Sequence, residues 1–147
     1  MTLNKMLVAY DFSEPANRAL RFVAMLASAT GAALELVYVL PEVYDGRAEV
    51  ELTLPAMVPG QSERYLKFLA EELRRVAQTT TPELASKAGY HVLRGDAVKH
   101  IEALAKELAA DLICVGATGK NAVARALLGS TSQQLLRTSP IAVLVVP

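Results

Sequence analysis

Short apolar runs alternate along the chain with longer stretches of helical periodicity. Five runs have the length of strands buried on both faces and cover residues 6–10, 34–40, 90–93, 111–115 and 141–146. Apolar residues recur every three or four positions between them, which predicts helices over 14–30, 62–78 and 98–108, with a short fourth helix over 130–138. Strands separated by helices favour parallel pairing with right-handed crossovers. The pattern therefore predicts a doubly wound α/β sheet covered by helices on both faces.

Capping residues support the helix boundaries. Ser13 offers a hydroxyl for an N-cap and is followed by Glu14 and Pro15, which suit the first turn of a helix. Gly31 is a suitable C-terminal cap, and Asp96 is a suitable N-cap for the third helix. The segment from Pro41 to Gly60 has no clear periodicity. Such a long loop is unusual, so we expect a short helix, a lid or a partner contact there.

Composition narrows the class of protein. The chain has 147 residues, which favours one domain over 1–147, and equal numbers of basic and acidic residues, 15 each. This balance gives no general attraction to nucleic acid or to an anionic membrane. The single cysteine, Cys114, excludes an intrachain disulfide and a cysteine cluster for zinc. No run is long enough for a membrane helix or a signal peptide, so we expect a cytoplasmic protein.

The candidate chemistry follows the predicted strands, because ligands bind beyond the carboxyl ends of parallel strands. Asp11 follows the first strand. The fourth strand is followed by Gly116-Ala-Thr-Gly119 and, nine residues later, by Gly129-Ser-Thr131 at a helix start. Glycines let the backbone approach an anion and reach positive φ, and a helix N-terminus adds free N–H groups. Lys120 and Arg125 lie between the two glycine segments. The same residues also suit a simple turn and helix cap, so composition alone leaves both interpretations open.

The spacing resembles a known family. Gly116-x2-Gly119-x9-Gly129-Ser130 matches the G-x2-G-x9-G-(S/T) signature of ATP-binding universal stress proteins. The residues from Val8 to Ala16, Arg94 to Ala97, Ala110 to Gly116 and Pro140 to Val146 are similar to further segments of that family, so the resemblance covers essentially the whole chain. It implies a five-stranded parallel sheet in the order 3-2-1-4-5.

The resemblance also implies a site and a ligand. Asp11 and Val39 would contact the adenine, and Val115 and Gly116 would lie near the ribose. Gly119, Gly129, Ser130 and Thr131 would hold the phosphates of ATP, accompanied by Mg²⁺ or Mn²⁺. Ala117 stands where many members of the family have a bulkier or polar residue, which leaves the shape of the ribose side open. The family commonly dimerises through its last strand, so a homodimer through Ile141–Val146 is expected.

Three functions remain after other classes are weighed: a nucleotide-binding sensor, a slow ATPase, and a dimeric interaction module that has no ligand. The chain lacks the G-x4-G-K-(S/T) loop of fast ATPases. It also lacks the acidic pair and the final lysine of response-regulator receivers, and the S-G-G loop of the related adenylating enzymes. His91 and His100 have no cysteine or carboxylate partner at ligand spacing, which favours structural roles. Cys114 lies within an apolar strand and is expected to be buried and inert.

Overall fold

The computed structural model describes residues 2–41, 62–119 and 128–147. The loop predicted from Pro41 to Gly60, apart from Pro41, and both Lys120 and Arg125 lie outside these residues. The elements follow one another as β1 (Lys5–Ala9), α1 (Glu14–Thr30), β2 (Ala33–Leu40), α2 (Ser62–Thr80), α3 (Pro82–Ala85), β3 (Gly89–Arg94), α4 (Ala97–Glu107), β4 (Leu112–Gly116), α5 (Ser130–Thr138) and β5 (Ala142–Val146).

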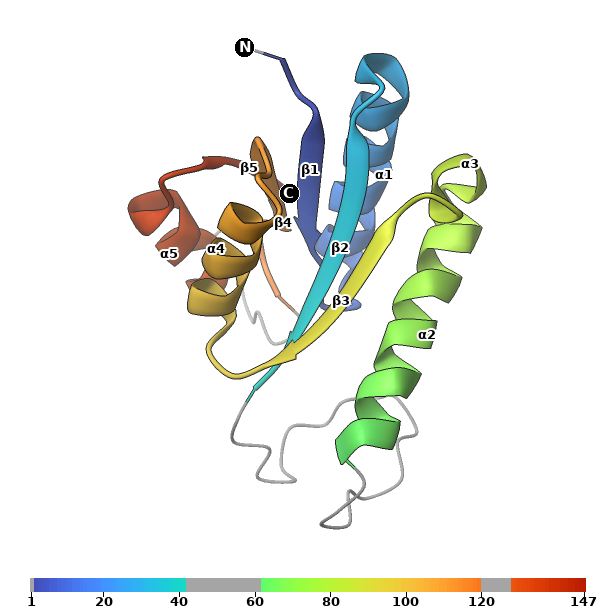
Figure 1. Ribbon diagram of the computed structural model, residues 1–147. Coiled ribbons are helices and arrows are strands. Elements are labelled where there is room, and N and C mark those ends of the chain that lie inside the picture. Colours follow the sequence, from blue (N-terminus) through green and yellow to red (C-terminus); the bar gives the residue numbers. More distant parts are fainter. Residues whose placement is uncertain (1, 42–61, 120–127) are drawn as a thin grey trace.

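The five strands form one parallel sheet in the order β3-β2-β1-β4-β5, which confirms the predicted fold class and strand order (Figure 1). The order reverses between β1 and β4. In this pair Met6 lies opposite Leu112 and Ala9 lies opposite Val115. The residues that leave the two strands, Asp11 and those after Gly116, therefore meet at one edge of the sheet.

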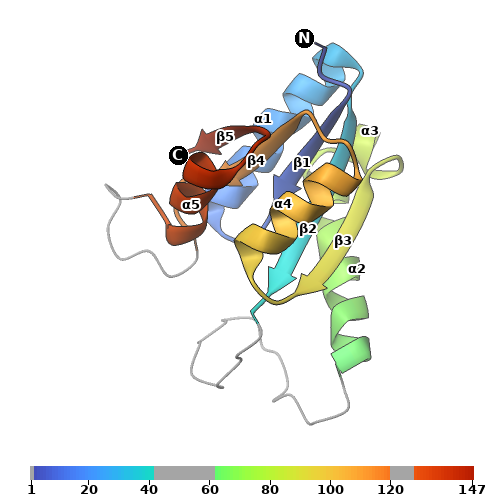
Figure 2. The same cartoon turned by 60° about the vertical axis from the view of Figure 1, so that its left-hand side comes forward.

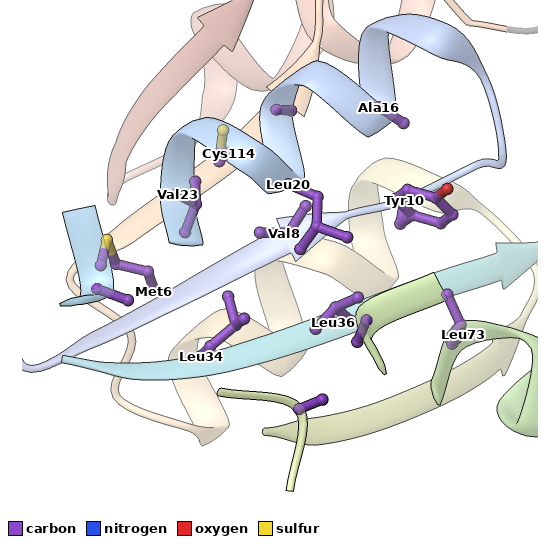
Figure 3. Packing of buried hydrophobic residues seen from close by; sticks show 14 of the residues in the cluster. Met6, Val8, Tyr10, Ala16, Leu20, Val23, Leu34, Leu36, Leu73 and Cys114 are labelled. Atoms are coloured by element: carbon purple, nitrogen blue, oxygen red, sulfur yellow. The ribbon is translucent and has the colours of Figure 1, made fainter. Parts of the chain in front are cut away.

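Helices cover the sheet on both faces, as the pattern predicted. On one face, α1 and α2 pack over a cluster of buried side chains that includes Val8, Leu20, Leu36 and Leu73 (Figure 3). On the other face, α4 and α5 cover a second cluster that includes Leu7, Val37, Ile101 and Leu135 (Figure 2). Apolar residues on both sides of the central strands explain why their sequences are continuous apolar runs rather than alternating ones.

The predicted caps are present. Ser13 has extended backbone angles and its hydroxyl accepts a hydrogen bond from Ala16 N, while Gly31 closes α1 in the left-handed conformation with φ of 74°. Asp96 caps α4 by accepting from Lys99 N. The helix α3 was not predicted. It begins at Pro82, beyond the predicted end of the second helix at residue 78, and its four residues are too few to show a period.

Candidate functional site

Two glycine segments, Gly116–Gly119 and Gly129–Thr131, contact each other at the switch point, where the strand order reverses between β1 and β4. Gly129 N donates a hydrogen bond of 2.7 Å to the carbonyl oxygen of Ala117, and Ala117 N donates one of 2.7 Å to Val146 O. The hydroxyl of Ser132 lies 2.9 Å from the carbonyl oxygens of both Ala117 and Gly129. The turn after β4 is therefore tied by backbone hydrogen bonds to the end of β5 and to the start of α5.

The three glycines of the signature lie close to neighbouring segments. A Cβ on Gly129 would lie 3.3 Å from Gly119 N, and a Cβ on Gly116 would lie 2.8 Å from the carbonyl carbon of Pro15. A Cβ on Gly119 would lie 3.1 Å from Asp11 Oδ2. None of the three has a positive φ; among the described residues the positive-φ glycines are Gly31 and Gly95. The expectation that these loop glycines reach positive φ is therefore wrong. Contact with backbone leaves no room for a Cβ at Gly116, whereas the space at Gly119 and Gly129 is tight.

The N-terminus of α5 faces this turn with its backbone donors. Gly129 is the N-cap residue and provides no side chain, and no side chain in the described parts of the chain caps the helix. The first N–H groups of an α-helix have no partner within the helix, and the helix dipole places partial positive charge there. Ser130 is exposed and Thr131 is half-buried, and both belong to this first turn of the helix. Such an arrangement suits an anion.

Asp11 follows β1 and lies at the same end of the sheet as the turn after β4. Its Oδ1 accepts hydrogen bonds from the backbone N–H of Ser13, at 3.0 Å, and from the Ser13 hydroxyl. Its Oδ2 faces Gly119. The next residue, Phe12, has a φ of 63°, an uncommon conformation for a bulky side chain. Its ring packs edge-on against Tyr10 and Tyr38, with centroid distances of 5.1 and 5.4 Å.

The remaining predicted residues also lie near the carboxyl ends of the strands, but they differ in burial and in the elements that they contact. Val115 is buried at the end of β4, and Val39 is half-buried near the end of β2, where it packs against the α4 and α5 side of the core. Gly116 is enclosed by the start of α1, at Pro15 and Ala16. The structure thus brings Asp11, Gly119 and Gly129 together, and Val39 lies on the neighbouring strand β2, two residues beyond Val37, the partner of Ala9.

Two residues of this edge were not assigned a site role from sequence. Ser13 was predicted as a helix cap, and its contact with Asp11 is additional. Ser132 is buried and bonds back to Gly129 three residues earlier, a spacing typical of serine in a first helical turn. The contact with Ala117 depends on the tertiary fold and leaves no local signal.

Burial raises the pKa of two groups in the core. Burial raises the pKa of the Tyr10 phenol to about 12, and the carboxylates of Asp11 and Glu14 add to the rise. The phenol donates a hydrogen bond to Asn17 Oδ1. Burial likewise raises the pKa of the Cys114 thiol to about 12, which agrees with the predicted inert cysteine.

His91 has a partner that sequence spacing did not reveal. Its Nε2 lies 2.8 Å from Glu35 Oε2, and Lys5 Nζ lies 4.0 Å from the other oxygen of Glu35. Glu35 pairs with Gly89 across β2 and β3, and the absent side chain at Gly89 leaves room for the carboxylate. Within the described residues, no group of three or more histidine, cysteine or acidic side chains is placed to hold a metal ion.

The fold and this edge define a class: doubly wound parallel α/β proteins with a glycine-lined turn and a helix N-terminus at the switch point. The model of the universal stress protein family matches residues 2–147, and the chain belongs to that family. No helix in the described portion has the length and apolar character needed to cross a bilayer.

Individual relatives agree with this assignment. A universal stress protein homologue of Staphylococcus aureus strain USA300 is 31% identical over 155 aligned positions, which cover 99% of this chain and 85% of the relative. The universal stress protein UspA of Lactobacillus plantarum has the same fold, with a TM-score of 0.75, 23% identity and coverage of 100% and 99%. A universal stress protein solved in complex with cAMP has a TM-score of 0.66, 25% identity and coverage of 99% and 98%.

Proposed function

We propose that this chain binds one adenine nucleotide, with ATP as the expected ligand, and works as a stress-response sensor or regulator rather than as a fast enzyme. The observation that carries the proposal is the contact between the two glycine segments, in which a Cβ at Gly129 would lie 3.3 Å from Gly119 N. Bare backbone and the N-terminus of α5 meet there at the switch point of the sheet. This is the setting in which phosphate groups bind to backbone N–H groups.

Among the described residues, the phosphate end would use neutral donors. Gly119, Ser130 and Thr131 would provide backbone N–H groups and two hydroxyls. The N–H of Gly129 already donates to Ala117 O, so Gly129 would contribute bare backbone at the helix start. An Mg²⁺ or Mn²⁺ ion would therefore be held by the phosphate oxygens, because the described residues offer no cluster of ligands for it.

The adenosine end would lie toward β1 and β2. Asp11 offers a carboxylate oxygen for a donor of the nucleoside, and Val39 and Val115 offer apolar surface at the ends of neighbouring strands, with Gly116 beside the ribose. Binding of cAMP by one structural neighbour supports an adenine nucleotide as the ligand class. The proposal concerns the nucleotide class, with ATP expected first among ATP, ADP, AMP and cAMP.

Titration calorimetry of the nucleotide-stripped protein tests the proposal. ATP, ADP, AMP and cAMP are titrated with Mg²⁺ into the wild type and into Gly129→Ala, Gly129→Val and the control Ala33→Val. Ala33 is exposed at the start of β2, at the other end of the sheet. We expect one site per chain for the wild type and the control. Gly129→Val should weaken binding about tenfold or more, because its side chain pushes against Gly119 and displaces charge-assisted hydrogen bonds. Unchanged affinity in a folded Gly129→Val variant would refute the site.

The edge strand β5 supports a second proposal, a symmetric homodimer. Among the described strands β5 pairs only with β4, and its apolar residues are half-buried or exposed. Two helices that contact it carry exposed apolar side chains, Phe22 on α1 at 40% and Leu136 on α5 at 50%. An uncovered apolar edge favours pairing with a second copy.

Sedimentation equilibrium tests the dimer. Ala142→Lys places a charge on an exposed position of β5 and should shift the mass toward the monomer, while Ala33→Lys should leave it unchanged. A wild-type mass that stays at the monomer value at every concentration contradicts the dimer. A dimer that gives no heat with any nucleotide favours the ligand-free interaction module instead.

A further inference from the structure

Ser132 differs from the two residues that precede it in α5. It is 2% exposed, whereas Ser130 is exposed and Thr131 is half-buried. Its hydroxyl lies 2.9 Å from the carbonyl oxygen of Ala117 and 2.9 Å from that of Gly129. A carbonyl oxygen can only accept, so the single hydroxyl proton of Ser132 is shared between the two glycine segments. The hydroxyl is therefore committed to protein atoms rather than to a ligand.

The two carbonyl oxygens at this contact have no further capacity to accept. Ala117 O accepts from Gly129 N at 2.7 Å as well as from Ser132. Gly129 O accepts from Gln133 N at 2.9 Å as well as from Ser132. Two donors match the two lone pairs of a carbonyl oxygen. Both oxygens thus point to donors of α5, and neither is directed at an anion bound beside the helix start.

The backbone donors at the same contact have the opposite disposition. Gly119 N lies 3.3 Å from the position of a Cβ on Gly129, and it has no acceptor among the described residues. In the same part of the chain no side chain caps the N–H groups that begin α5. Acceptors are therefore occupied and donors are left available, which is the polarity that a phosphate requires.

We propose that Ser132 is a positioning residue for the phosphates. By holding Ala117 O and Gly129 O, it keeps acceptor oxygens away from the ligand and keeps the Gly119 N–H beside the start of α5. This inference rests on the proposed nucleotide site. Ser132 does not touch the ligand, and it acts only on the segments that meet the phosphates. Its effect should therefore grow with the length of the phosphate chain.

Titration calorimetry with ATP, ADP and AMP tests the inference, because the three ligands share one nucleoside. Ser132→Ala should fold, since each of the two carbonyl oxygens keeps one backbone donor. It should weaken ATP binding about tenfold and AMP binding about twofold, with ADP between them. The ratio of ATP to AMP affinity should consequently fall about fivefold. A general loss of stability would weaken all three equally and leave this ratio unchanged.

Two further variants separate the hydrogen bonds from size and from helix stability. Ser132→Cys has nearly the same shape but only a weak donor, so it should also lower the ATP-to-AMP ratio. Ser139→Ala is the matched control at the other end of α5, where the Ser139 hydroxyl donates to Ile141 O at 2.9 Å and accepts from Ile141 N at 3.1 Å. It removes two hydrogen bonds from the end of the same helix and should keep the wild-type ratio.

The outcomes are distinct once circular dichroism identifies the folded variants. A wild type that binds none of the nucleotides refutes the proposed function, and the inference with it. A wild type that binds ATP, combined with an unchanged ratio in either folded Ser132 variant or an equal fall in Ser139→Ala, overturns the role of Ser132 and leaves the nucleotide site intact. If Ser132→Ala does not fold, the ratio in Ser132→Cys decides. A lower ratio in the Ser132 variants alone supports the inference.

Discussion

Gly116 and Gly119 belong to the same signature, yet replacing each with alanine should affect different properties. A Cβ at Gly116 would lie 2.8 Å from the carbonyl carbon of Pro15 and 2.9 Å from Ala16 N. Ordinary carbon contacts are about 3.5–4.0 Å, so β4 and the start of α1 must separate. Overpacking against backbone of this kind costs ~2 kcal/mol. At Gly119 the nearest atom is Asp11 Oδ2, at 3.1 Å, which belongs to the end of a side chain that can turn away.

Urea unfolding measures the first effect and calorimetry the second. Gly116→Ala should lower the free energy of unfolding by ~2 kcal/mol, which corresponds to a fall in Tm of about 4–8 °C for a chain of this size. Gly119→Ala should unfold close to the wild type but bind nucleotide severalfold more weakly, because Asp11 is displaced. Equal stability losses in the two variants, or a Gly116→Ala variant as stable as the wild type, would show that the steric reasoning is wrong.

Two further predictions concern pH. The pKa values of Tyr10 and Cys114 are raised to about 12, so the stability that both groups contribute is complete below their ordinary values and is lost as the pH rises toward 12. Thermal melts should therefore show a falling Tm between about pH 9 and 12, and a Tm that stays level would contradict this prediction. The thiol of Cys114 should react with a disulfide reagent at about pH 8 only after the protein unfolds. Hydrogen bonds from Asn4 N and Lys5 N hold the pKa of Asp111 below its ordinary value, so its stabilising effect is present above roughly pH 4 and is lost as the pH falls through the folded value. Asp111→Asn should be less stable than the wild type at pH 7 in urea unfolding, and the difference should shrink in acid; a constant difference would count against this cause.

The elements of the fold could be predicted from sequence because each pattern is local. A continuous apolar run such as Met6–Ala9 and the caps at Ser13 and Asp96 are set by neighbours in the chain, and the structure confirms them within one or two residues. The short helix α3 could not be predicted in this way. It follows the buried Thr81, begins at Pro82 and contacts α2, and its four residues are too few to carry a repeating pattern.

The candidate site was predictable only in part. The glycine spacing is visible in the sequence, but the reason for Gly116 is its distance from Pro15, which only the packing of α1 on β4 establishes. The pair formed by His91 and Glu35 depends on the register of β2 and β3, because the two residues are 56 positions apart. Long-range contacts of this type arise from topology, and no short window of sequence contains them.

The hydrogen bonds around Ala117 have a consequence for the free energy of binding. The turn after β4 is joined to α5 by protein atoms alone, through Gly129 N, Ala117 O and the hydroxyl of Ser132. A ligand that enters such a preorganised cradle does not spend its interaction energy on bringing the two glycine segments together. More of that energy is then left for distinguishing one anionic ligand from another.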